Sequence, residues 1–121
     1  MNSITLSAAP DTPIPTGLHC ANITRANMQQ RANRNGKLFT SLHLEFTDAS
    51  GARASLMVPD FTGLIPTVFT ALGEPFTAEP ITGERLLNLR GCNAEIHVSH
   101  VLNNGKTYAN VLSLNGHQVR K

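Results

Sequence analysis

The chain has 121 residues, of which 40% are hydrophobic and 15% charged, with a net charge of +2. These values are ordinary for one folded domain and exclude a wholly disordered chain. No Trp and a single Tyr indicate a mostly aliphatic core, and the mild positive charge permits a polyanion partner without requiring one.

The N-terminal segment, residues 1–16, is predicted to be an extended arm. Pro10, Pro13 and Pro15 each lack an N–H and fix φ, which disfavours a helix. An edge strand and a flexible tail are equally compatible with this composition. The segment lacks the features of a signal peptide, and no later stretch approaches the roughly 20 apolar residues of a membrane helix. We therefore expect a cytoplasmic protein without a membrane partner.

The first predicted strand covers residues 17–28. Leu18 and Cys20 share one face of it, whereas the next apolar residue, Ile23, has the opposite parity. A β-bulge near residues 21–22 would explain the change and would bend the strand as a small barrel requires.

Two more strands are predicted to complete a meander. Residues 34–37, Arg-Asn-Gly-Lys, form an Asn-Gly turn flanked by cations, and residues 48–51 form a second turn. Residues 38–46 and 53–58 alternate in polarity around these turns. The predicted inward side chains are Leu38, Thr40, Leu42, Leu44 and Phe46 on the second strand, and Ala54, Leu56 and Val58 on the third.

The apolar spacing becomes helical after Pro59. A short helix is predicted at roughly residues 65–72, with Pro66 in its first turn and Gly73 as a left-handed cap. Residues 74–84 are predicted to be a loop. The apolar stripe of the helix consists of Leu64, Ile65, Val68, Phe69 and Leu72.

A second hairpin is predicted for residues 87–114, with its turn at Asn104-Gly105. Its first strand places Cys92, Ala94, Ile96 and Val98 on one face, and Asn93, Glu95, His97 and Ser99 on the other. Residues 115–121 are predicted to be a polar tail.

Neither a metal site nor an active site is predicted. Cys20 and Cys92 are interpreted as two buried thiols, although a disulfide stays compatible with the sequence. Cys92 and His97 point to opposite faces of their strand, as do His97 and His100, so these side chains do not converge on a metal. No Gly-rich phosphate loop precedes a helix, and no acid–base pair has a suggestive spacing. We expect a non-enzymatic protein without a cofactor.

The predicted order is three strands, a helix and two strands. A mainly β fold is therefore expected: a five-stranded OB-fold barrel over residues 17–114, with the helix between strands three and four. An SH3-like barrel and another small α+β meander are the alternatives.

The chain also resembles the OB-fold single-stranded-DNA-binding proteins and their relatives carried by phages and plasmids. The resemblance implies that single-stranded nucleic acid binds along strands two and three and between the two hairpins. It lies in the basic turn of residues 34–37, the helix end at Ala71-Leu72-Gly73, Leu89-Arg90-Gly91, residues 104–108 and Asn110-Val111.

A cationic groove with flat side chains on which bases stack is the site expected of such a protein. Phe39 has outward parity beside the first turn, and Tyr108 lies next to Lys106, so both are candidate stacking residues. Packing under a loop is the alternative for both aromatic rings, and solvated turns are the alternative for the cations. The other phenylalanines, Phe46, Phe61, Phe69 and Phe76, are assigned to core or loop packing. The candidate phosphate-binding residues are Arg25, Arg31, Arg34, Lys37, Arg53 and Lys106.

The sequence thus predicts a protein that binds single-stranded DNA, in preference to RNA, with little sequence specificity, in the replication or recombination of a phage or mobile element. The alternative is an OB-fold protein-interaction module, an assembly subunit or an inhibitor of a host complex, that binds no nucleic acid. Scarce aromatic residues and the modest charge favour this alternative. Self-association and a replication or recombination protein as partner are compatible with both.

Overall fold

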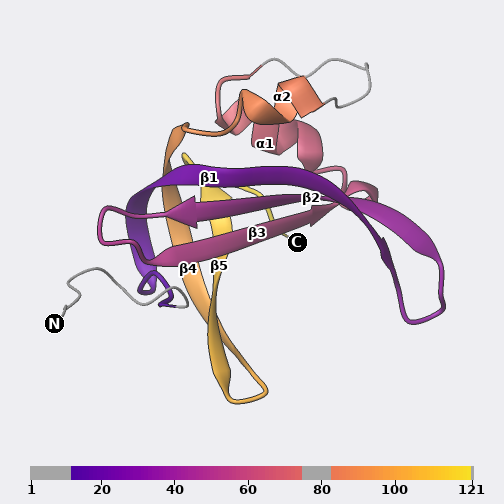
Figure 1. The fold of residues 1–121 in the computed structure, drawn as a ribbon, viewed down its shortest axis with the longest axis horizontal. Helices are drawn as coiled ribbons and strands as arrows, with labels where there is room; N and C mark the ends of the chain where they lie inside the picture. The colour runs from indigo at the N-terminus through magenta and orange to yellow at the C-terminus, as the bar shows by residue number, and fades with distance from the viewer. Residues whose placement is uncertain (1–11, 75–82, 121) are drawn as a thin grey trace, which may run out of the picture.

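A single sheet of six strands dominates the computed structural model of the chain, which describes residues 12–74 and 83–120 (Figure 1). The strands are β1 (Gly17–Ala32), β2 (Leu38–Thr47), β3 (Arg53–Pro59), β4 (Asn93–Asn103), β5 (Lys106–Leu114) and β6 (His117–Gln118). Their order in the sheet is β3-β2-β1-β4-β5-β6, and these neighbours are antiparallel. A parallel bridge between Ser55 of β3 and Asn110 of β5 brings the sheet into a nearly closed ring. The mainly β prediction is confirmed.

The helical segments lie between β3 and β4. They are η1 (Asp60–Thr62), α1 (Ile65–Ala71) and α2 (Gly83–Leu87). As predicted, Pro66 occupies the first turn of α1, and Gly73 has a left-handed φ of 76° after its end. Arg85 of α2 lies 5.3 Å from the centre of the Phe69 ring, which joins α2 to α1. No helix in the described ranges is long and apolar enough to cross a membrane.

The chain before β4 differs from the prediction. The loop expected over residues 74–84 is interrupted by α2, and β4 begins at Asn93 instead of near residue 87. Residues 88–91 form a turn, in which the amide of Leu89 donates to the carbonyl of Leu86 and Gly91 has a φ of 84°. Leu89 lies in this turn and is nevertheless buried in the core, so a residue before β4 contributes to the core without belonging to a strand.

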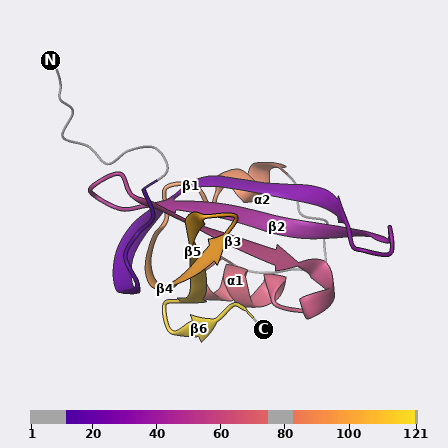
Figure 2. The same cartoon turned by 90° about the horizontal axis from the view of Figure 1, so that it is seen from below.

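The interior of the ring is filled by the side chains that strand alternation predicted. The inward residues of β3 and β4 are buried, as are those of β2 from Leu42 onward. Leu38 and Thr40 are the exceptions, because β1 and β2 extend past the core as a projecting hairpin (Figure 2). The buried set includes Leu42, Leu44, Phe46, Ala54, Leu56, Val58, Ala94, Ile96 and Val98, joined by Ile65, Val68 and Phe69 of α1.

The predicted burial of the Cys20 thiol on β1 was wrong. Ala21 and Ile23 point into the core, whereas Leu18 is 63% exposed and Cys20 is also exposed. The bulge lies between Ile23 and Arg25, slightly later than expected, and only there does the inward parity change. Neither thiol is fully buried: Cys20 is exposed and Cys92 is half-buried. Partial burial and, secondarily, Glu74 raise the pKa of the Cys92 thiol.

Both ends of the described chain join the sheet. The backbone of Ile14 and Thr12 pairs with Arg53, with both N–O distances 2.9 Å, and Ile14 is buried. Residues 1–11 of the predicted arm lie outside the described residues. At the other end, a turn at residues 115–116 leads into β6, and Val119 is 1% exposed. The sheet therefore extends beyond the expected boundary at residue 114.

Candidate functional site

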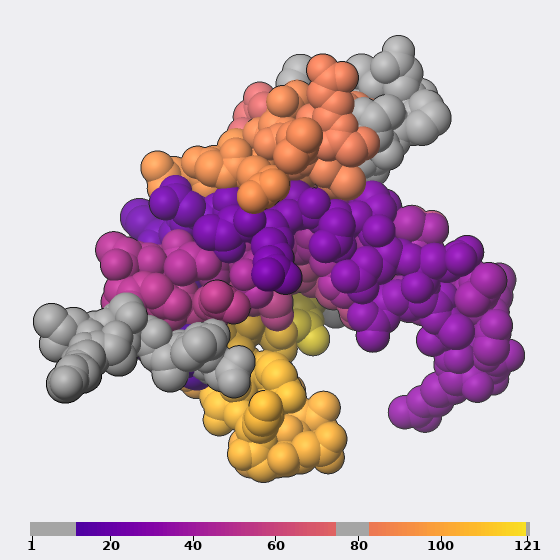
Figure 3. Space-filling view, viewed as in Figure 1, coloured from indigo at the N-terminus to yellow at the C-terminus, as the bar shows by residue number. Residues whose placement is uncertain are grey.

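Two adjoining hollows form one groove beside β3 and β5, with volumes of about 380 and 600 Å³. Ser55 and Tyr108 line both hollows, so the two hollows are neighbours on one surface. Figure 3 shows the β1–β2 hairpin and the β4–β5 hairpin projecting from the body with an open space between them. The charged and aromatic lining residues are Arg31, His43, Glu45, Arg53, Lys106, Tyr108 and Arg120.

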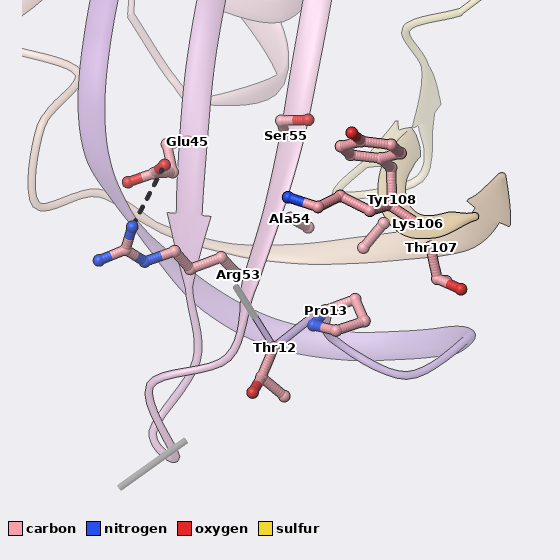
Figure 4. Close-up of a pocket in the computed structure, with 10 residues that line it drawn as sticks. Thr12, Pro13, Glu45, Arg53, Ala54, Ser55, Lys106, Thr107 and Tyr108 are labelled. Atoms are coloured by element: carbon pink, nitrogen blue, oxygen red, sulfur yellow. Dashed lines mark ion pairs between the residues drawn. The ribbon is translucent and has the colours of Figure 1, made fainter. Parts of the chain in front are cut away.

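One end of the groove is formed by Arg53 of β3 and Lys106 and Tyr108 of β5. Figure 4 shows the Lys106 side chain extended beside the Tyr108 ring, with its ammonium toward β3. Tyr108 keeps 46% of its surface exposed. A flat, accessible ring thus lies beside the Lys106 side chain, whereas the Arg53 guanidinium is directed toward Glu45.

Glu45 of β2 is an acidic residue within this cationic end. Its carboxylate oxygens lie 3.9 Å from Arg53 Nη1 and 3.9 Å from Arg25 Nε. Both pairs are partly solvated, so their contribution to stability is small. Arg25 therefore reaches the margin of the groove through Glu45.

The other end contains Arg31 of β1, His43 of β2 and Arg120 after β6. The His43 ring nitrogen Nε2 lies 2.8 Å from Ser41 Oγ, and Ser41 is completely buried. Partial burial, followed by the Arg31 charge, lowers the pKa of His43. Both effects disfavour the protonated ring.

An aromatic pair lies beside this end. The rings of Phe39 and Phe61 meet edge to face, with centroids 5.2 Å apart. Phe39 is opposite Arg31 in the β1–β2 register, which places the pair next to a groove cation. Phe61 is 72% exposed and therefore lies outside the core, although its ring packs on Phe39. Phe46 and Phe69 are buried as predicted, and Phe76 lies outside the described residues.

The structure gathers some of the predicted site residues and separates others. Arg31, Arg53, Lys106 and Tyr108 line the groove. Arg34 and Lys37 lie in and beside the β1–β2 turn and line neither hollow. That turn is organised by Asn33, whose side-chain oxygen accepts hydrogen bonds from the amides of residues 35 and 37.

Two groove-side residues were missed by sequence reasoning. Arg120 was assigned to a polar tail, yet the turn before β6 returns it to the groove. Phe61 lies in a single 3-10 turn, where no periodicity reports the direction of a side chain. Phe61 directly follows Pro59-Asp60 and belongs to neither the strand pattern nor the helix pattern. That position was the signal in the sequence that its side chain could be exposed.

The chain has no match among protein-family models or curated proteins. Among residues 12–74 and 83–120, no group of three or more His, Cys, Asp or Glu side chains is placed to hold a metal ion. The groove thus offers cations, the accessible Tyr108 ring and polar strand side chains, and the Phe39–Phe61 pair lies beside its Arg31 end.

Proposed function

We propose that the chain is an OB-fold protein that binds single-stranded nucleic acid in this groove with little sequence specificity. DNA as the preferred ligand, and a role in replication or recombination of a phage or mobile element, follow from the sequence resemblance. The OB-fold assignment is supported by the closure of the sheet through β3 and β5 and by the position of α1 between β3 and β4. β6 would be an addition to the five-stranded barrel.

The observation that carries the proposal is the placement of Tyr108 between two groups of cations in one open groove. Arg53 and Lys106 lie at one end, and Arg31 and Arg120 at the other. A single strand presents regularly spaced phosphates and unpaired bases, which match cations alternating with a flat ring. In duplex DNA the bases are stacked on one another, so no base face is available to stack on Tyr108.

In this mechanism the cations neutralise phosphates while a base stacks on Tyr108, and Phe61 offers a second ring at the Arg31 end. Stacking supplies about 1–3 kcal/mol per base and tolerates any base, because every base has a flat face. Phosphate neutralisation releases counterions, so affinity falls steeply as salt rises. Phe39 contacts Phe61 edge to face and supports it instead of acting as the main platform.

The test is fluorescence anisotropy of labelled oligo-dT of about 30 nucleotides, longer than the site size of one OB barrel. We expect salt-sensitive binding that unlabelled single strands compete for and duplex DNA does not. Lys106→Glu is expected to weaken binding, whereas Arg90→Glu, which reverses an exposed charge outside both hollows, is the matched control. Absence of binding at low salt, or equal loss in both variants, would contradict the proposal.

A protein-interaction module is the second candidate function. It is favoured by Val101 and Leu102, which are exposed on β4 near the tip of the β4–β5 hairpin. Exposed neighbouring apolar side chains are typical of contact surfaces between proteins. This candidate predicts association with a protein, or with a second copy, that persists at high salt and is weakened by Leu102→Ser.

A further inference from the structure

Three polar side chains form a row across the strands that line the groove. Glu45 of β2 is directly opposite Ser55 of β3, and Ser55 is bridged to Asn110 of β5. Opposed residues in a sheet point to the same face, with Cβ atoms of neighbours about 5 Å apart. Tyr108 precedes Asn110 by two residues and therefore shares its face. The row thus lies beside the proposed stacking ring.

The row has unused hydrogen-bonding capacity. The 3.9 Å ion pairs of Glu45 exceed hydrogen-bond length, so its carboxylate keeps free acceptor sites. Within residues 12–74 and 83–120, the side chains of Ser55 and Asn110 form no hydrogen bond. The Glu45 carboxylate only accepts hydrogen bonds, whereas the Ser55 hydroxyl and the Asn110 amide can each donate and accept them. Such a set suits the polar edge of a base better than a phosphate, which the carboxylate repels.

We propose that the Glu45–Ser55–Asn110 row recognises the Watson–Crick edge of a base stacked on Tyr108 and favours a base that carries an amino group, cytosine over uracil. This inference rests on the proposed function and adds a preference at one nucleotide position. The cytosine N4 amino group donates to the Glu45 carboxylate. Uracil presents an oxygen at the same position, which the carboxylate repels. Arg53 and Lys106 stay available for the flanking phosphates.

A simpler role for Glu45 is to position Arg25 and Arg53. Loss of its charge would then change the affinity for every oligonucleotide by the same factor, since both arginines act on the common phosphate backbone. The ratio of dissociation constants for two oligonucleotides that differ only in the base edge separates the two roles.

The experiment compares labelled oligo-dC and oligo-dU of about 12 nucleotides, within the range bound by one OB barrel, at neutral pH and one salt concentration. The two pyrimidines have the same ring size, and oligo-dT serves to isolate the effect of the 5-methyl group. The wild-type protein is expected to bind oligo-dC about three- to tenfold more tightly than oligo-dU, as one charge-assisted hydrogen bond predicts.

Glu45→Gln is the decisive variant. Its amide offers both a donor and an acceptor, so the ratio is expected to fall to about one while overall affinity rises through the lost negative charge. Glu95→Gln removes the same charge from an exposed position on β4 that lines neither hollow, and should keep the wild-type ratio.

Each failure has a separate meaning. Equal, measurable affinities of the wild-type protein for oligo-dC and oligo-dU would overturn the base preference and leave the proposed function intact. A preference that persists in Glu45→Gln would overturn the role of Glu45. Absence of binding to either oligonucleotide at low salt would overturn the proposed function, and this inference with it.

Discussion

Phe61 of η1 meets Phe39 of β2 edge to face, with the ring planes at 73°, while its own ring stays mostly exposed. The contact with Phe39 restrains the Phe61 ring, which keeps 72% of its surface exposed. The pair therefore acts as a fixed, accessible aromatic surface at the Arg31 end of the groove.

We predict that Phe61→Ala weakens binding of single-stranded DNA by about five- to a hundredfold, the loss of one stacked base. Thermal unfolding should change little, because most of the ring is already in water. Anisotropy titration and a melting curve measure the two effects. Leu87→Ala, an exposed apolar residue of α2 outside both hollows, is the control and should bind as the wild-type protein does. Unchanged affinity of Phe61→Ala would exclude the ring from the site.

The position of each cation predicts a different salt dependence. Lys106→Gln should reduce the slope of log affinity against log salt by about 0.7, the value for one phosphate contact on a single strand. Arg34 and Lys37 lie at the β1–β2 turn, away from both hollows, so Lys37→Gln should reduce the slope by less. The measurement is a salt titration of each variant with the same oligonucleotide. An equal reduction in the two variants would extend the binding surface to the hairpin tip.

His43 predicts a pH dependence of stability. Burial and Arg31 lower its pKa in the folded protein below the ordinary value of 6.5. The unfolded chain then binds this proton more readily, so the stability that neutral His43 contributes is complete above about pH 6.5 and is lost as pH falls through the folded pKa. Urea unfolding at pH 5 and pH 8 should show a larger acid loss in the wild-type protein than in His43→Asn. Parallel pH profiles of the two proteins would show that His43 is not the responsible group.

Val119 tests whether the C-terminal segment belongs to the folded unit. Its side chain is buried after β6, and its amide bonds the carbonyl of Leu112 at 3.0 Å. Val119→Ala should reduce the free energy of unfolding by about 1–3 kcal/mol, as expected for two methyl groups removed from a core. Gln118→Ala, a neighbouring exposed residue of β6, is the control in the same denaturation experiment. If the C-terminal segment made no tertiary contacts, neither variant would change the free energy of unfolding.

Local patterns in the sequence were sufficient for much of the fold. Alternation in residues 42–46, 53–58 and 94–98 predicted which side chains enter the core, because a strand with one wet face has a period of two. Helical spacing, Pro66 and Gly73 predicted α1 because these residues act through their own backbone geometry. Tyr108 and Lys106 were also singled out by their place at the tip of the second hairpin, and both line the groove.

Other features needed the assembled sheet. Alternation shows that Leu18 and Cys20 share a face but does not show which face meets the core, and here the smaller Ala21 is buried instead. A two-residue strand such as β6 is too short for any periodicity, so the return of Val119 and Arg120 was not visible.

The sequence by itself determined the five longer strands in outline, the main turns, α1 and the mostly aliphatic core, since each depends on residues close together in the chain. Only the tertiary structure decided the groove. Tyr108, Arg53 and Glu45 belong to three strands, and they share one surface because the bridge between Ser55 and Asn110 closes the ring. Ring closure depends on the pairing of Ser55 with Asn110, which are more than 50 positions apart. Local sequence patterns do not show which distant strands pair.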